Sequence, residues 1–222
     1  MVNGNKKIKN KLDYIPSKLK IGFCRKGGIE YYLIIGNQFD IVDFHEKEIG
    51  VDWQEINTPF LINLLKEFID DQRNYILLAH MYPDKEELKE FAKSILEPLG
   101  LKYKIFKKSY GIFKKKYQNF LIIYNIRKKE LISQIFTFKR SDADIVNHYI
   151  EIFVPLSAKK LPQEIFESDF NIEKELGSTL KCWIKINDLY EVEIYHYKYS
   201  LKEIDEKVRT LAKKFNIELE YM

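Results

Sequence analysis

The sequence predicts an α+β protein built mainly from antiparallel sheets with amphipathic helices. Short runs of β-branched and aromatic residues recur along the chain and are separated by glycine or asparagine turns, as in antiparallel strands. Two longer segments, 83–100 and 200–215, repeat apolar residues every three or four positions, as amphipathic helices do. At 222 residues and 45% hydrophobic content, the chain is long enough to bury a sizeable core.

The first part of the chain reads as a basic arm followed by strands and two helices. Residues 1–20 carry six lysines against one acid, Asp13, and form the predicted basic N-terminal arm. Helices are predicted over 58–71, where Thr58 and Pro59 mark the first turn, and over 83–100, which ends at Pro98 and Gly100. Strands are predicted over 18–25, 29–36, 37–44, 75–82 and 101–107, the first two joined by a Lys-Gly-Gly turn.

The rest of the chain repeats this mixture of elements. Residues 141–156 fit either a short helix or a strand, and helices are predicted over 161–177, ending at Gly177, and over 200–215. The remaining apolar runs predict strands over 119–126, 130–140, 179–186, 190–199 and 216–222.

Two strand–helix–strand segments can be aligned with each other. Residues 75–106 and 191–222 match in apolar positions, with His80 opposite His196 and Leu88 opposite Ile204. We therefore expect two pseudo-repeated halves packed as one unit, the first over 21–108 and the second over 109–222.

Aromatic residues recur about every seven positions between Tyr103 and Tyr124. As a helix, this segment would place the rings on one stripe. Gly111 and the β-branched residues instead favour two strands joined near 109–111, which would send successive tyrosines to different faces. Most of these rings are then expected in a core, and a subset is expected on the surface.

The same region holds most of the positive charge. Residues 102–140 contain twelve Lys and Arg against one acid, Glu130, although the whole chain has a net charge of only +4. Lysines interleaved with aromatic rings are typical of surfaces that bind single-stranded nucleic acid, where rings stack on bases and lysines contact phosphates. The predicted contact residues are Lys107, Lys108, Tyr110, Lys114, Lys115, Lys116, Tyr117, Arg127, Lys128 and Lys129.

Two histidines suggest an enzymatic alternative. If the two halves are repeats, His80 and His196 would lie at equivalent strand ends and could act as general base and general acid on a phosphodiester. This arrangement resembles the two-histidine phosphoesterases, whose halves each carry His-x-Thr or His-x-Ser. The stretches here are His-Met-Tyr and His-Tyr-Lys, so neither has the hydroxyl residue at the third position.

A second pattern loosely resembles a nucleotidyltransferase site. Gly177-Ser178 is followed by Glu191 and Glu193. The paired metal ligands of that family are mostly aspartates, and little of the chain follows Glu193. Strand alternation explains these glutamates better, and no metal or other cofactor is expected.

These patterns lead to one predicted function and two alternatives. We expect a non-catalytic cytoplasmic binding or accessory protein whose segment 102–140 contacts nucleic acid or an acidic protein surface. The alternatives are the phosphodiesterase and an immunity or inhibitor protein that docks on another protein through the acidic stretches 39–55 or 162–175. No apolar run is long enough to span a membrane, and no secretory signal is visible. Cys24 and Cys182 are expected as buried free thiols, and the bias towards lysine, isoleucine and asparagine suggests an AT-rich genome such as that of a phage or mobile element.

Overall fold

The fold is seen in a computed structural model that describes most, but not all, of the chain. The described residues are 18–36, 58–69, 74–79, 85–110, 116–128, 130–131, 135, 149–157, 161, 164–167, 171–187 and 191–222. The strand predicted over 37–44, most of the basic arm and the acidic stretch 39–55 lie outside these residues.

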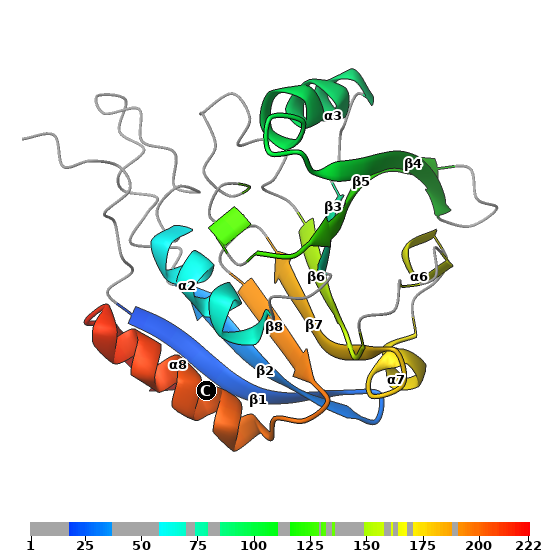
Figure 1. Ribbon diagram of the computed structural model, residues 1–222. Helices are drawn as coiled ribbons and strands as arrows, with labels where there is room; N and C mark the ends of the chain where they lie inside the picture. Colours follow the sequence, from blue (N-terminus) through cyan, green and yellow to red (C-terminus); the bar gives the residue numbers. More distant parts are fainter. Residues whose placement is uncertain are drawn as a thin grey trace, which may run out of the picture.

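One nine-stranded sheet runs through the described residues, in the order β4-β5-β3-β6-β7-β8-β2-β1-β9 (Figure 1). Neighbouring strands are antiparallel, except that β1 and β9 are parallel. The sheet and its helices confirm the predicted mainly antiparallel α+β class. The strands are β1 Lys18–Lys26, β2 Ile29–Gly36, β3 Asn74–Ala79, β4 Lys102–Tyr110, β5 Lys116–Ile126, β6 Tyr149–Pro155, β7 Leu180–Asn187, β8 Glu191–His196 and β9 Glu218–Tyr221.

Different helices cover the two faces of the sheet. The larger helices are α2 Thr58–Phe68, α3 Lys85–Phe91 with the π-helical turn η4 Ala92–Leu96, and α8 Leu201–Lys214. They cover one side, which we call the helix face, and α2 lies beside α8 there (Figure 1). The short helices α6 Glu164–Glu167 and α7 Ile172–Glu175 pack on the opposite side, which we call the ladder face.

Amphipathic spacing builds the core on the helix face. Leu88 and Phe91 of α3 are fully buried, as are Ile204 and Val208 of α8, so the predicted inward faces of both helices are confirmed. They pack against alternate strand residues such as Ile184, which point to this side because side chains on a strand alternate in direction.

A row of aromatic rings crosses the ladder face. Cross-strand pairing aligns Tyr75 with Phe153, Phe153 with Trp183, and Trp183 with Tyr195 on neighbouring strands. Tyr124 and Tyr31 extend the row at its two ends, with ring centroids 5.9 Å from Tyr75 and 4.8 Å from Tyr195, respectively. Such cross-strand aromatic pairs stabilise neighbouring strands, so these rings belong to a second core.

Two sequence predictions need correction. The segment 130–140 was expected as a strand, but Glu130, Leu131 and Ile135 are helical. Leu131 and Ile135 are four residues apart, a spacing that turns both side chains towards the helix-face core. The helix expected over 161–177 is instead the two short helices α6 and α7, although Gly177 does end the segment, with a φ of +86°.

Neither cysteine forms a disulfide, as predicted, but only one is fully buried. Cys182 lies in the core of the helix face, whereas half-buried Cys24 is paired with Tyr31 on the ladder face. Because the sheet separates their side chains, these two residues do not form a disulfide in this fold.

Candidate functional site

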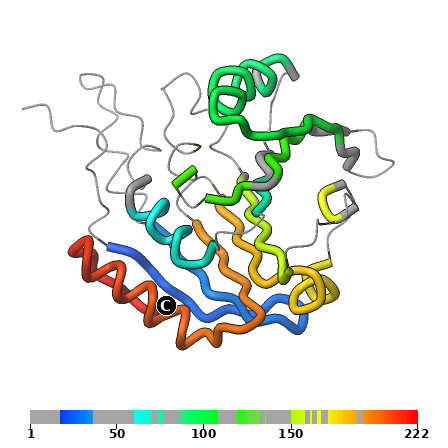
Figure 2. Tube along the Cα trace, viewed as in Figure 1, coloured from blue at the N-terminus to red at the C-terminus, as the bar shows by residue number. Residues whose placement is uncertain are grey.

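The basic aromatic segment forms a β-hairpin at one end of the sheet. β4 and β5 pair in continuous antiparallel register from Lys102 opposite Tyr124 to Tyr110 opposite Lys116. The prediction of two strands is therefore confirmed and the helical alternative is excluded. Figure 2 shows this hairpin in green, at the end of the sheet opposite the blue β1 strand and the red α8 helix.

The seven-residue repeat sends its rings to both faces, as expected for strands. Tyr103 packs against the helix-face core and donates a hydrogen bond to Glu97, with an O–O distance of 2.9 Å. This hydrogen bond, together with burial, raises the pKa of Tyr103. Tyr124 lies on the ladder face against Tyr75 and Phe166. Both tyrosines are therefore packing residues.

Phe106 and Phe120 form a different kind of ring pair. They lie opposite each other on β4 and β5, with centroids 5.5 Å apart and ring planes 15° apart. Both are half-buried and pack at the border of the ladder-face core. Strand alternation places Lys102 and Lys104 on the same face of β4 as Phe106. The end of the ladder face thus combines partly exposed rings with lysines.

Further cations gather where the hairpin meets the rest of the chain. Lys102 begins β4, and Arg127 and Lys128 directly follow β5; all three are exposed. Lys107 is exposed too, but alternation places it on the helix-face side of β4. Of the other predicted contact residues, Lys108, Tyr110, Lys116 and Tyr117 lie within the strands, with side chains outside the described part, and Lys114, Lys115 and Lys129 lie outside it altogether.

A row of charged residues beside the aromatic rings of the ladder face was not predicted from the sequence. Pairing places Glu151, Lys185 and Glu193 side by side on β6, β7 and β8. Glu151 accepts a hydrogen bond from the Trp183 indole at 2.9 Å, and Lys185 lies over that indole, 4.7 Å from the ring centroid. The side chains of Lys185 and Glu193 are only 14% and 13% exposed, with 3.9 Å between their charged atoms.

This row holds its side chains in fixed positions. The Tyr195 hydroxyl donates to Glu193 at 2.7 Å, and burial together with this bond raises the pKa of Tyr195. Only strand register could have revealed the row, since its members lie on three strands.

The residues of the nucleotidyltransferase-like pattern have structural surroundings. Glu191 and Glu193 alternate with buried Val192, as expected for a strand. Ser178, the other part of the nucleotidyltransferase-like pattern, bonds to the backbone carbonyls of Lys174 and Glu175.

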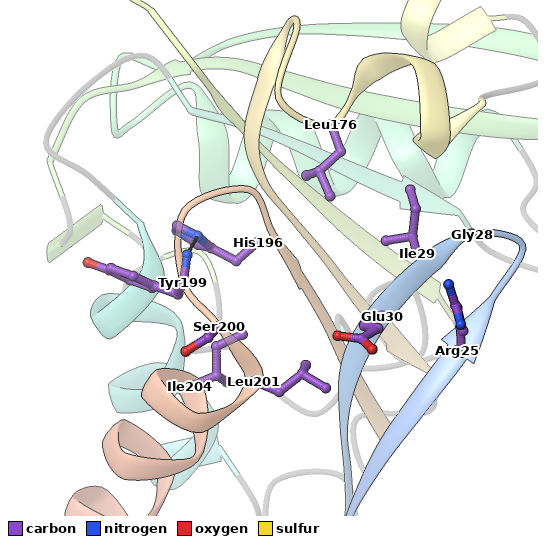
Figure 3. A pocket seen from close by; sticks show the side chains of 10 residues that line it. All are labelled: Arg25, Gly28, Ile29, Glu30, Leu176, His196, Tyr199, Ser200, Leu201 and Ile204. Atoms are coloured by element: carbon purple, nitrogen blue, oxygen red, sulfur yellow. Dashed lines mark hydrogen bonds between the residues drawn. The ribbon is translucent and has the colours of Figure 1, made fainter.

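His196, at the end of β8, lines a pocket that lies away from the basic hairpin (Figure 3). The pocket has a volume of about 330 Å³ and lies between the β1–β2 turn and the first turn of α8. Ile29, Leu176 and Leu201 supply apolar walls, and Arg25 and Glu30 add one charge of each sign.

The hydrogen bonds of His196 assign it a local structural role. Its Nδ1 accepts backbone N–H groups from Lys198 at 3.0 Å and from Tyr199 at 2.9 Å, and its ring stacks on Tyr199 at 4.0 Å. A nitrogen that accepts two N–H groups carries no proton, so these bonds select the neutral Nε2–H tautomer. The side chain thereby shapes the turn from β8 into α8. His80 lies outside the described residues, so an approach of the two histidines stays a prediction.

Comparisons with known proteins identify no relative. No protein-family model, curated protein or solved structure matches the chain. Within the described residues, no group of three His, Cys, Asp or Glu side chains is placed to hold a metal ion. No described helix is long and apolar enough to cross a membrane.

Proposed function

We propose that this protein is a non-catalytic binding protein that takes up single-stranded nucleic acid on the β4–β5 hairpin. The observation that carries the proposal is the half-buried Phe106–Phe120 pair, which shares a sheet face with Lys102 and Lys104. Single strands are bound by this combination because every base has a face that can stack and every nucleotide carries a phosphate.

The two rings are suited to stacking because their orientation is already set. Each packs against the ladder-face core along one side, and the pair is stacked within 15° of parallel. A base that contacts such a ring does not have to order it first, which lowers the entropic cost of binding. Base–aromatic stacking contributes about 1–3 kcal/mol per base.

The positive charge of the β4–β5 hairpin also favours nucleic-acid binding at this surface. The β4 and β5 strands contain five lysines and no acid, and Arg127 and Lys128 follow them. Cations at this density attract a polyanion over roughly 10 Å at moderate salt. The nearby Glu97 is engaged by Tyr103 on the helix face, on the other side of the sheet from the Phe106–Phe120 pair.

Fluorescence anisotropy with a labelled single-stranded oligonucleotide tests the proposal. Replacing Lys102, Arg127 and Lys128 together by Gln should reduce the steepness of the log affinity–log salt plot by about two units, from about 0.7 per lost phosphate contact. A matched control replaces the exposed Lys198, Lys202 and Lys213, which lie far from the hairpin in sequence and at the other sheet end. This control should leave the slope unchanged.

Ring substitutions separate nucleic acid from an acidic protein partner. Phe106→Leu should weaken oligonucleotide binding about tenfold, since about 1.4 kcal/mol of stacking corresponds to a factor of ten. Phe23→Leu, which changes an exposed ring near the opposite sheet edge, is the control. If Phe106→Leu has no effect and polyglutamate competes as well as the oligonucleotide, the surface recognises charge alone and the nucleic-acid proposal is wrong.

A further inference from the structure

Exposed apolar side chains cluster at the other edge of the sheet. On the helix face, Phe23 of β1 is 54% exposed and Tyr221 of β9 is 42% exposed. Met222 follows β9 and is 63% exposed, but its methyl group lies beside Gly22, on the same side of β1 as Cys24. The rings of Phe23 and Tyr221 lie 6.3 Å apart. Large apolar side chains that gather on a surface in this way are typical of an interaction site.

An open groove continues this cluster along α8. It has a volume of about 720 Å³, with Ala212, Ile217 and Leu219 as apolar lining. Arg209 and Lys213 from successive turns of α8 supply positive charge, and Glu218 at the start of β9 supplies one negative charge. The Arg209 guanidinium lies 4.9 Å from the centre of the Tyr221 ring, so the groove and the exposed rings are one continuous surface. We call this surface the β9 edge groove.

The groove lies beside the outermost strand of the described sheet. β9 pairs only with β1 in that sheet, along four residue pairs from Lys18–Glu218 to Ile21–Tyr221. An edge strand of this kind can accept an added strand through its backbone. Leu219 and Tyr221 face the helix side, and alternation turns Glu220 to the other side, where it forms an ion pair with Lys18 at 3.0 Å.

We propose that the β9 edge groove binds an extended segment of another protein, which adds to β9 as a further strand. The two faces of β9 predict its sequence pattern. Side chains on the helix side would meet Arg209, Lys213 and the apolar floor, so acidic and apolar residues fit there. Residues in between would lie on the same face as Glu220, whose carboxylate also pairs with Lys18, so basic or small polar residues fit the alternate positions.

A displayed library of random peptides of about ten residues tests the proposal with the whole protein as bait. We expect enriched sequences that alternate acidic or apolar residues with basic or polar ones. Lys213→Glu should weaken the best peptide about tenfold or more, because it places like charges together. Lys202→Glu, at an exposed position near the start of the same helix, should leave its affinity unchanged.

Further variants of peptide and protein define the outcome. A proline at a central position of the peptide should abolish binding, since proline cannot donate to a strand ladder. Phe23→Ser should also weaken binding, and amide NMR shifts on binding should concentrate in residues 209–222. No enrichment, enriched peptides without alternation, or binding that survives Lys213→Glu would overturn the proposal. Sedimentation that shows dimers lost in Phe23→Ser would overturn it in favour of a second copy as the occupant.

Discussion

Two strand–helix–strand units contain the two edge strands of the described sheet, and they differ in how many strands lie between the connected pair. In the first, α3 and η4 connect β3 to the edge strand β4, with β5 between them. In the second, α8 connects β8 to the edge strand β9, with β2 and β1 between them. In both, the connected strands run parallel and the helix lies on the helix face.

The helices of the two units differ in their terminal turns. α8 begins with a capping box in which the Ser200 hydroxyl and the Glu203 carboxylate each accept the other residue's backbone N–H. The Ser200 N–H and hydroxyl both donate to the Glu203 carboxylate, and these two bonds lower its pKa. In the first unit, α3 widens into η4, where the Glu97 N–H donates to the Ala92 carbonyl at 2.9 Å. Pro98 follows directly and has no N–H to continue an α-helix, which explains the irregular end.

Polar contacts also distinguish the units. Asp205 of α8 is buried and accepts hydrogen bonds from Tyr32 at 2.7 Å, Arg209 at 2.7 Å and Tyr221 at 2.9 Å. These contacts tie α8 to β2 and β9. The aligned position in the first unit is Lys89, which forms an ion pair with Glu86 on the same helix. The comparison shows that similar apolar spacing does not imply equivalent structure, and the repeat itself stays a prediction.

The largest effects should come from the buried apolar residues of the two helices. Phe91→Ala should cost about 3–5 kcal/mol of unfolding free energy and Ile204→Ala about 2–5 kcal/mol, because each leaves a cavity in the same core. Urea titrations followed by circular dichroism and by tryptophan fluorescence, to which the buried Trp183 contributes, measure both. If the units are one folding unit, each variant shifts both signals together. Separate transitions would show that the halves unfold independently.

The next effect should be confined to the second unit. Asp205→Asn should cost about 1–3 kcal/mol near neutral pH, because it removes the buried charge that the Tyr32, Tyr221 and Arg209 donors contact. Burial raises the pKa of Asp205, but the hydrogen bonds from Tyr32, Arg209 and Tyr221 outweigh it, so the pKa is lowered overall.

The sign of this shift gives a pH test. A lowered pKa in the folded state stabilises the protein above the unfolded pKa of about 3.9, and this contribution disappears as pH falls through the folded value. The difference in unfolding free energy between wild type and Asp205→Asn should therefore shrink below about pH 4. Glu206→Gln, at an exposed neighbouring position, should show no comparable dependence. A difference that stays constant down to low pH would contradict the assigned charge.

Local spacing predicted most elements of the fold but not their order in the sheet. The β1–β2 hairpin follows from a glycine turn, with Gly27 at a φ of +59°, and α8 follows from apolar spacing and Ser200. By contrast, the insertion of β2 and β1 between β8 and β9 depends on contacts between distant parts of the chain. The strand prediction was wrong at the described residues Glu130, Leu131 and Ile135, because a short apolar run fits a strand or a helix equally well.

The candidate sites show the same limit. Charge counting located the basic hairpin, but only strand register shows that Phe106 lies beside Lys104 while Tyr103 packs on the opposite face. Glu151, Lys185 and Glu193 come from separate strands, so no local motif could reveal their row. His196 drew attention as a chemical group, yet its hydrogen bonds to the following turn could be seen only in three dimensions.

The smallest predicted effect concerns the helix ends. Ser200→Ala should cost about 1 kcal/mol, because the Glu203 N–H loses its acceptor at the start of α8. Ser94→Ala in η4 is the matched control, since its hydroxyl bonds only weakly to the Phe91 carbonyl, at 3.3 Å, and that turn has no side-chain cap. Its expected cost is below about 0.5 kcal/mol, as for ordinary surface positions. Paired urea titrations measure the two costs side by side. Equal costs would mean that the capping box does not distinguish the units, and the difference between them would then rest on the Asp205 contacts alone.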